Sequence, residues 1–366
     1  MIDPQVITVE LHGQIVGQVV SSASGMCAFQ YDPSYLQLGQ SISPLALPLT
    51  NSVMVAKPEP FRGNFGVFDD SLPDGWGRLI QDRMLRERGV DPLGLTTLQR
   101  LAIVGHDGRG ALEYEPNQSL TEATTTVIDL KALDASISRL LATDEAEMSD
   151  LVTLAQLGGS SGGARPKIFL REGEGEWLVK FAAHTDPPDV GCTEYRYSLI
   201  AGHCGVIMPE TRLFDDRFFG VRRFDRTPQG KVHVVSVAGL LDADFRVPSL
   251  DYQSLMALTR RLTRDMAEVE QMYRRLVFNV AIGNRDDHAK NFSFMMESGG
   301  RWTLTPAYDL LPSPGFNGFH TTTVNGSGNP GDDDVVTIGV RAGLTRSRSV
   351  AILNEIRDVV SVVDQL

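Results

Sequence analysis

The segment 286–291, with the sequence DDHAKN, brings together the side chains best suited to chemistry. It follows an apolar stretch, 276–283, which is expected to be the end of a buried helix. Asp286 and Asn291 stand five positions apart. With this D-x-x-x-x-N spacing, a carboxylate orients an attacking hydroxyl and an amide oxygen holds a metal ion during phosphoryl transfer. Asp287 competes for the role of base, and the spacing to Asn291 favours Asp286.

A second candidate metal ligand follows the first. The stretches 292–296 and 302–304 are expected to form a short hairpin, which leads into the sequence PAYDLLP with Asp309. Asn291 and Asp309 together offer two oxygen ligands, a set that suits Mg²⁺ when phosphates and water complete the coordination. His288 is expected to have a structural role, because no second His or Cys stands at ligand spacing.

The phosphate side of such a site is expected upstream. The glycine-rich stretch 158–163 precedes a strand at 167–172, and backbone N–H groups of such a loop can approach phosphates. A second strand, 177–181, carries Lys180, which could bind phosphate if a carboxylate such as Glu194, at the start of a predicted helix, fixed its side chain. Each feature also has a plain alternative, namely a flexible turn and an exposed lysine at a strand end.

Composition limits the classes of function. The chain has 366 residues, 42% of them hydrophobic and 22% charged, which predicts a globular protein of two or three compact units. A net charge of −12 argues against autonomous binding to DNA or to anionic membranes. Three scattered cysteines, no signal peptide and no apolar stretch of membrane-spanning length together predict a cytoplasmic protein.

The order of predicted elements indicates three parts in an α+β protein. Residues 1–118 are expected to form a small α+β subdomain, with a hairpin at 6–20, a strand at 26–31 and helices at 74–88 and 96–104. In the first of these helices Asp74 is the expected N-cap. Residues 119–225 are expected to contain a helical stretch, 119–157, then the strands and a hinge at 222–226. Residues 226–366 are expected to be mostly helical, with helices at 251–264, 265–283 and 346–363 and a loop at 313–334.

Taken together, these segments resemble the HipA family of bacterial toxin serine/threonine kinases over nearly the whole chain. The segments that carry the resemblance are FDDSLPDGWGRLIQDR, GGARPK, VRRFDR, IGNRDDHAKNFSF and LTPAYDLLPS. The resemblance implies a protein-kinase-like, two-lobed fold: a mixed β N-lobe with an extra N-terminal subdomain, and a mostly α-helical C-lobe. It also implies a serine/threonine protein kinase that uses ATP and Mg²⁺.

The resemblance also implies roles for single residues. Asp286 matches the catalytic base, Lys290 a lysine that neutralises transferring charge, and Asn291 with Asp309 the Mg²⁺ ligands. The matching nucleotide-binding positions are Lys180, Glu194, Gly162, Gly163 and Lys167, with Arg222 and Phe224 at the hinge. Family members autophosphorylate a serine of the phosphate loop, and Ser160 is the matching position with Ser161 beside it. Two residues depart from the family pattern: Arg222, where an acidic residue is common, and Arg165 in the phosphate loop.

Partners follow from the same resemblance. The implied protein is the toxin of a toxin–antitoxin pair that phosphorylates a translation protein, such as an aminoacyl-tRNA synthetase. A small helix-turn-helix antitoxin would hold it on operator DNA, which the toxin itself would contact only indirectly. Two alternatives remain open at this stage: a small-molecule or lipid kinase on the same scaffold, and an antitoxin-binding transcriptional co-repressor.

Overall fold

A computed structural model describes residues 3–120, 128–142, 148–158, 161–173, 175–315 and 317–363. The chain divides into two compact units. Unit 1 comprises Met1–Cys192 and Arg212–His233, and unit 2 comprises Thr193–Thr211 and Val234–Leu366. Each unit is described by itself. In the described ranges, no helix is both long enough and apolar enough to span a bilayer.

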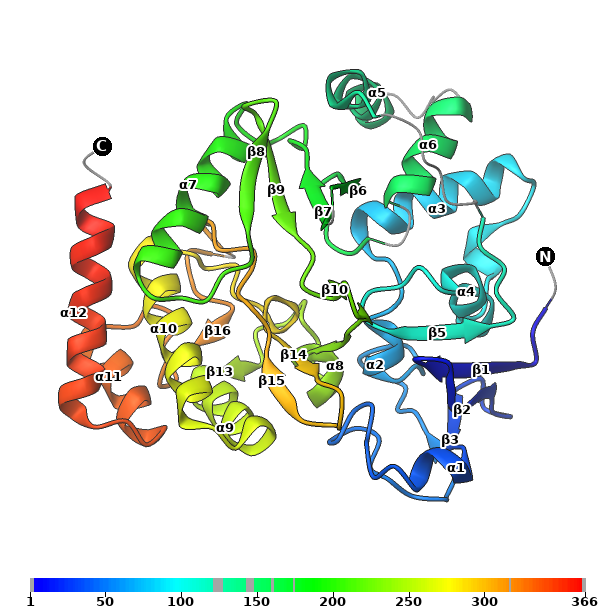
Figure 1. The fold of residues 1–366 in the computed structure, drawn as a ribbon, viewed down its shortest axis with the longest axis horizontal. Helices are drawn as coiled ribbons and strands as arrows, with labels where there is room; N and C mark the ends of the chain where they lie inside the picture. Colours follow the sequence, from blue (N-terminus) through cyan, green and yellow to red (C-terminus); the bar gives the residue numbers. More distant parts are fainter. Residues whose placement is uncertain are drawn as a thin grey trace. The chain divides into compact units, whose positions relative to one another are not determined.

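Unit 1 begins with an antiparallel sheet in the order β4-β3-β2-β1-β5 (Figure 1). Its strands are β1 (Val6–Leu11), β2 (Gln14–Ser21), β3 (Cys27–Tyr31), β4 (Met54–Val55) and β5 (Leu112–Glu115). Alternate residues of β1 are buried, as the period of two in the sequence predicts, and the expected hairpin and third strand are confirmed. The helices of this part are α1 (Pro33–Leu36), α2 (Gly66–Asp69), α3 (Gly75–Glu87), η1 (Pro92–Gly94) and α4 (Thr97–Val104).

The predicted N-cap position of α3 is confirmed, but the capping hydrogen bond is not. Asp74 stands at the N-cap position of α3, but its side chain makes no capping hydrogen bond there. Its carboxylate instead accepts a hydrogen bond from the backbone N–H of Gly163. Local sequence predicts a cap because Asp is a good N-cap residue, whereas the structure uses the carboxylate for a partner 89 residues away.

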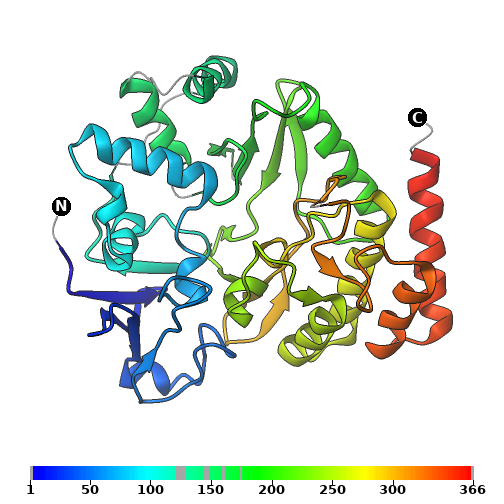
Figure 2. The ribbon, with the colours of Figure 1, turned by 180° about the vertical axis from the view of Figure 1, so that it is seen from behind.

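The second sheet of unit 1 has the order β6-β7-β9-β8. Its strands are β6 (Lys167–Glu172), β7 (Gly175–Lys180), β8 (Thr211–Phe214) and β9 (Phe218–Arg222), and two helices precede it, α5 (Leu130–Ala142) and α6 (Met148–Gly158). The helical stretch predicted for 119–157 is confirmed over α5 and α6, and its residues 121–127 and 143–147 lie outside the described residues. Helix α3 packs against α6 (Figures 1 and 2). Trp76 of α3 belongs to one buried apolar cluster with residues of α5, α6, β6, β7 and β9.

The sequence predicts a mostly helical chain after the hinge, but extended structure continues beyond it. Two short hairpin strands, β10 (Arg226–Thr227) and β11 (Gly230–Lys231), follow, and the Thr227 hydroxyl closes their turn by donating to the Gly230 carbonyl at 2.9 Å. Strand β12 (His233–Ser236) comes directly after them. These strands are two to four residues long and too short for a period of two to reveal them.

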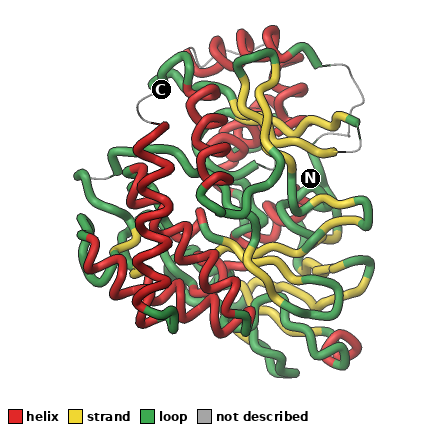
Figure 3. The backbone as a smooth tube through the Cα atoms, turned by 60° about the vertical axis from the view of Figure 1, so that its left-hand side comes forward, coloured by secondary structure: helices red, strands yellow, loops and turns green. Residues whose placement is uncertain are grey.

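Unit 2 combines helices with short strands (Figure 3). Its helices are α8 (Val237–Leu241), α9 (Tyr252–Thr263), α10 (Met266–Ile282), η2 (Ala289–Asn291), α11 (Asp332–Arg341) and α12 (Arg346–Val363), and α7 (Val190–His203) crosses from unit 1. Strands β14 (Ser293–Met296) and β15 (Trp302–Leu304) form the predicted hairpin and join β12 in one sheet, while β13 (Leu250–Asp251) pairs with β16 (Thr322–Thr323). Helix α10 packs between neighbours α9 and α12.

Two boundaries differ from those expected in this unit. Helix α7 begins at Val190, four residues before Glu194, so Glu194 lies inside the helix and not at its start. Helix α11 begins at Asp332 and reaches into the expected loop 313–334, because the Asp334 carboxylate accepts a hydrogen bond from Gly331 N at 3.0 Å and caps the helix. The predicted bounds of α9, α10 and α12 are confirmed to within about two residues.

A buried histidine makes the stability of unit 1 sensitive to pH. His233 is 1% exposed, and its Nε2 lies 2.8 Å from the Ile42 carbonyl. Burial lowers the pKa of His233 to about 4, against an ordinary value near 6.5. Above the ordinary value neither the folded nor the unfolded state binds the proton. As pH falls below it, the unfolded state is protonated first, and the folded state is disfavoured by about 2 kcal/mol at pH 5.

We expect His233→Gln to remove this share of the pH dependence, since glutamine can still donate to the carbonyl without titrating. Urea unfolding at pH 7.5 and pH 5 measures the effect, and the exposed His184→Gln serves as control. A wild-type loss of stability that persists unchanged in His233→Gln would show that other groups cause it.

Candidate active site

The carboxylate of Asp287 is completely buried and accepts hydrogen bonds from four groups. The Tyr252 hydroxyl and His320 Nδ1 lie 3.0 and 2.9 Å from one of its oxygens. The backbone N–H groups of Thr321 and Thr322 donate to the other oxygen at 2.9 and 3.2 Å. Burial, with the Asp287 charge next in effect, keeps the pKa of Tyr252 well above its ordinary value, so the phenol remains a donor. Asp287 therefore anchors the loop 284–291.

The neighbouring Asp286 differs completely in environment, since its side chain is 62% exposed. Its backbone N–H donates to Asn284 Oδ1 at 3.3 Å, and Asn284 is buried. The amide nitrogen of Asn284 donates to the Asp309 carbonyl at 3.2 Å and to Asn279 Oδ1 at 3.0 Å. One buried amide thus connects the backbones of the two acidic residues that the sequence singles out.

The two expected metal ligands both lie in unit 2. Asn291 Nδ2 donates to the Asp286 carbonyl at 2.7 Å, which joins the two ends of the D-x-x-x-x-N motif and orients the amide. Asp309 is exposed and has a φ of 54°, a left-handed conformation that is uncommon outside glycine. Such backbone strain concentrates at functional sites, where the surrounding structure maintains it.

The aromatic ring of Phe245, which no sequence motif marks, lies beside this loop. The Phe245 ring is 4.3 Å from Lys290 Nζ and 5.6 Å from the ring of His288. His288 Nδ1 accepts a hydrogen bond from Lys290 N at 3.2 Å at the N-cap of η2, which agrees with the structural role predicted for it, while its Nε2 lies 4.0 Å from Asp286 Oδ1. The Lys290 carbonyl accepts from the Tyr308 hydroxyl at 2.8 Å. The loop is held at both its backbone and its side chains.

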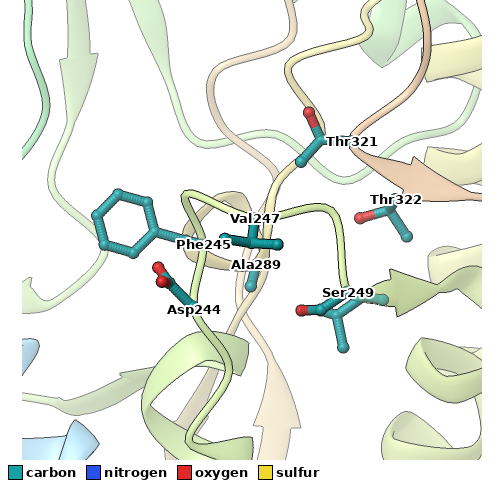
Figure 4. Close-up of a pocket in the computed structure, with 8 residues that line it drawn as sticks. Asp244, Phe245, Val247, Ser249, Ala289, Thr321 and Thr322 are labelled. Carbon is teal, nitrogen blue, oxygen red and sulfur yellow. The ribbon is translucent and has the colours of Figure 1, made fainter. Parts of the chain in front are cut away.

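A shallow pocket adjoins the same loop (Figure 4). Ala289, between His288 and Lys290, lies on one wall of the pocket, and Thr321 and Thr322 line it as well. The segment 244–250 contributes the remaining lining residues, Phe245 among them. The pocket therefore combines apolar side chains with hydroxyl groups next to the candidate base loop.

The expected phosphate loop lies in unit 1. Lys167 is 7% exposed, and its Nζ donates to the Gly162 carbonyl at 2.5 Å, while Gly162 and Gly163 are exposed. Ser161 is buried, and its hydroxyl donates to the Gly158 carbonyl at 2.6 Å. Ser160, the other predicted phosphorylation site, lies outside the described residues.

Lys180 is brought to the same part of unit 1. It ends β7 and pairs across the sheet with Lys167 at the start of β6, directly after the loop. Its Nζ lies 5.7 Å from the Phe219 ring. Glu194, its expected carboxylate partner, is a buried residue of α7 in the part of the helix that belongs to unit 2.

The hinge segment is fixed by a buried ion cluster within unit 1. Asp225, 6% exposed, accepts hydrogen bonds from Arg223 at 2.7 and 2.9 Å, from Arg226 at 2.9 Å and from Gly110 N at 3.0 Å. Burial alone would raise the pKa of Asp225, but the two guanidinium groups hold it well below its ordinary value. Arg226 also donates to the carbonyls of Gly108 and Gly110 at 2.8 and 2.7 Å. The N-terminal sheet region thereby holds the hinge, of which Arg222 and Phe224 are the half-buried neighbours.

Sequence reasoning missed several residues that position these groups. Tyr252 and His320 bind Asp287 from segments more than 30 residues away, and no periodicity or motif marks them. Asn284 lies next to the motif and could have been noticed, because a polar residue directly after an apolar helix end needs a hydrogen-bond partner.

Comparison with known proteins identifies relatives along most of the chain. The family model described as "HipA N-terminal domain" matches residues 7–115, and the one described as "HipA-like C-terminal domain" matches residues 159–363. Two curated proteins of Sinorhizobium fredii are similar. "Putative kinase Y4dM" is 23% identical over 87% of this chain and 80% of its own length. "Putative kinase Y4mE" is 28% identical over 85% of this chain and 78% of its own length.

A solved structure shows the same fold. It is a chain of the Shewanella oneidensis MR-1 "Toxin Antitoxin System HipA, HipB and its operator DNA complex", with a TM-score of 0.69 and 18% identity. The likeness covers 98% of this chain and 91% of that chain. The mixed α/β fold of several sheets and helices is therefore one already seen in that complex.

The two adjacent aspartates allow a direct test of their different environments. We expect Asp287→Asn to lower the free energy of unfolding by about 2–4 kcal/mol, because an amide nitrogen would then face hydrogen-bond donors in a buried site. Asp286→Asn should change it by no more than about 0.5 kcal/mol, since the side chain is exposed. Urea or thermal unfolding of the two variants measures both values. Equal stability of the two variants would contradict the anchoring role of Asp287.

Proposed function

Because this chain belongs to the HipA family, we propose that it is an ATP-dependent serine/threonine protein kinase and the toxin of a toxin–antitoxin pair. The observation that carries the proposal is the arrangement of the loop 284–291: an exposed Asp286 stands beside a buried, fully hydrogen-bonded Asp287. Rigid support beneath an accessible carboxylate is what a general base requires.

The residues of each unit fit ATP and Mg²⁺. In unit 1, Gly162 is exposed in the loop, and its backbone N–H is the group that could approach phosphates, since the N–H of Gly163 is bound to Asp74. Lys180 stands on the strand next to the loop. In unit 2, Asn291 and Asp309 supply an amide and a carboxylate oxygen, the donor types that Mg²⁺ prefers. When bound, Mg²⁺ neutralises phosphate charge, and these two residues would hold it.

We assign the chemical roles as follows. Asp286 accepts the proton of the acceptor hydroxyl while the hydroxyl oxygen forms its bond to the γ-phosphorus and the β,γ-bridging oxygen leaves with ADP. Lys290, held over the Phe245 ring, places a positive charge beside the transferred group. Lys180 binds the phosphates and Lys167 supports the loop, while the hinge residues Arg222 and Phe224 adjoin the adenine. Glu194 keeps the nucleotide-binding role that the family resemblance implies.

Autophosphorylation is proposed for the phosphate loop. The Ser161 hydroxyl is buried and donates to the Gly158 carbonyl, which leaves it poorly placed as an acceptor. We therefore favour Ser160. A phosphate adds about −1.5 to −2 charge to a loop that must hold ATP phosphates, so the modified enzyme is expected to be inactive.

Partners are proposed by analogy with the structural relative, which was solved with HipB and operator DNA. A small helix-turn-helix antitoxin would bind this chain and carry it to DNA, which suits its net charge of −12. The acceptor is proposed to be a translation protein such as an aminoacyl-tRNA synthetase.

One labelling experiment tests the proposal. Purified protein is incubated with γ-labelled ATP and Mg²⁺, alone, with a cell extract, and with a candidate helix-turn-helix partner added. We expect label on a serine of the phosphate loop and on an extract protein, with a lower rate when the partner is present. Asp286→Asn should lower the rate about 10²–10⁴-fold, the usual contribution of a general base, while the exposed Asp358→Asn should not.

Equal labelling by wild type and Asp286→Asn would refute the assignment of the base. Label found only in lipids or small molecules would support the alternative kinase class instead.

A further inference from the structure

The turn Asp74–Gly77 at the start of α3 lies directly against the glycine-rich loop in unit 1. The carboxylate of Asp74 accepts a hydrogen bond from Gly163 N, and the Gly163 carbonyl accepts one from Trp76 N at 2.9 Å. Both polar groups of Gly163 are thus bound by the same turn. Gly163 as a whole is nevertheless exposed. The hydrogen bonds fix the loop at Gly163 by its backbone, whatever side chains the loop carries.

The same turn also contacts residues on both sides of Gly163. After the loop, at the start of β6, the Lys167 carbonyl accepts a hydrogen bond from the indole Nε1 of the buried Trp76 at 3.0 Å. Before Gly163, Gly77 lies so close to Ser161 that a Cβ at position 77 would overlap the Ser161 carbonyl oxygen. Because the blocking atom belongs to backbone, any side chain at position 77 would have to displace the loop.

Two glycines are required for this approach. Gly75 has a φ of 42°, and a Cβ there would overlap the carbonyl oxygen of Gly163. Gly77 is helical, a position where glycine costs about 1 kcal/mol relative to alanine. The Asp74 side chain likewise makes no capping hydrogen bond to α3 and accepts one from Gly163 N instead. Departures from local rules of this kind concentrate at functional positions.

We infer that the turn Asp74–Gly77 is a clamp that positions the phosphate loop and thereby sets the affinity for the phosphates of ATP. The inference rests on the proposed function, because it names a positioning element of the same nucleotide site. Without the clamp, the described part of the loop, which includes Gly162 and Gly163, would lose backbone entropy when it bound phosphates. With the clamp, part of that ordering is already present in the folded protein.

The clamp predicts a specific pattern of binding. Asp74→Ala removes an ionised acceptor from the loop, and should raise the Kd for Mg²⁺ with a non-hydrolysable ATP analogue about tenfold. Gly77→Ala should raise it at least as much. The Kd for adenosine should stay within about twofold in both variants, because adenosine has no phosphates for the loop to hold. Asp74→Asn should restore most of the affinity, since its amide oxygen can still accept from Gly163.

Isothermal titration of each protein with the ATP analogue and with adenosine measures these values. The matched control is Gly202→Ala in α7, where a Cβ would meet no atom within 4 Å. An equal loss of affinity for both ligands would mean that the turn is only structural, and tighter binding of the analogue by Asp74→Ala would mean that the carboxylate obstructs the loop. Either result overturns the clamp. A wild type that binds neither ligand would instead refute the proposed kinase function.

Discussion

A buried carboxylate is stable only when hydrogen bonds replace its lost hydration, and Asp287 imposes this constraint on the candidate active site. Its partners come from α9, through Tyr252, and from the segment 320–322. The loop 284–291 therefore cannot move without leaving a charge or a donor unsatisfied. The buried Asp287 fixes the backbone beside Asp286, and the side chain of Asp286 is exposed to solvent.

In unit 1 the constraint is the conformational freedom of the glycine-rich loop, which must be restricted by contacts from other segments. Its backbone is bound by the Asp74–Gly77 turn, and the hinge is bound by Asp225 and Arg226 to the segment Gly108–Gly110. Both supports come from the part of the chain that matches the HipA N-terminal domain. That domain is thus structurally continuous with the proposed nucleotide-binding elements, and the clamp and the hinge cluster explain why the two parts form one compact unit.

The sequence predicted local features well and distant partnerships poorly. The hairpin of β1 and β2, the helices α3, α4, α9, α10 and α12, and the hairpin of β14 and β15 all follow from periodicity and turn residues close in the chain. The spacing of Asp286 and Asn291 also identified a loop whose ends are hydrogen-bonded to each other. By contrast, Asp74 was assigned a local cap because nothing in its neighbourhood indicates Gly163. The hydrogen bonds of Asp287 likewise join residues more than 30 positions apart, and no short motif can encode such pairs.

Hydrogen–deuterium exchange with and without Mg²⁺ and a non-hydrolysable ATP analogue tests the central claim most directly. That claim is the proposed use of ATP and Mg²⁺, for which the expected residues lie in each of the two units. The account predicts slower exchange, at the same analogue concentration, in segments 161–166 and 222–226 of unit 1 and in segment 286–291 of unit 2. Slower exchange in none of these segments, or in those of one unit alone, would contradict it.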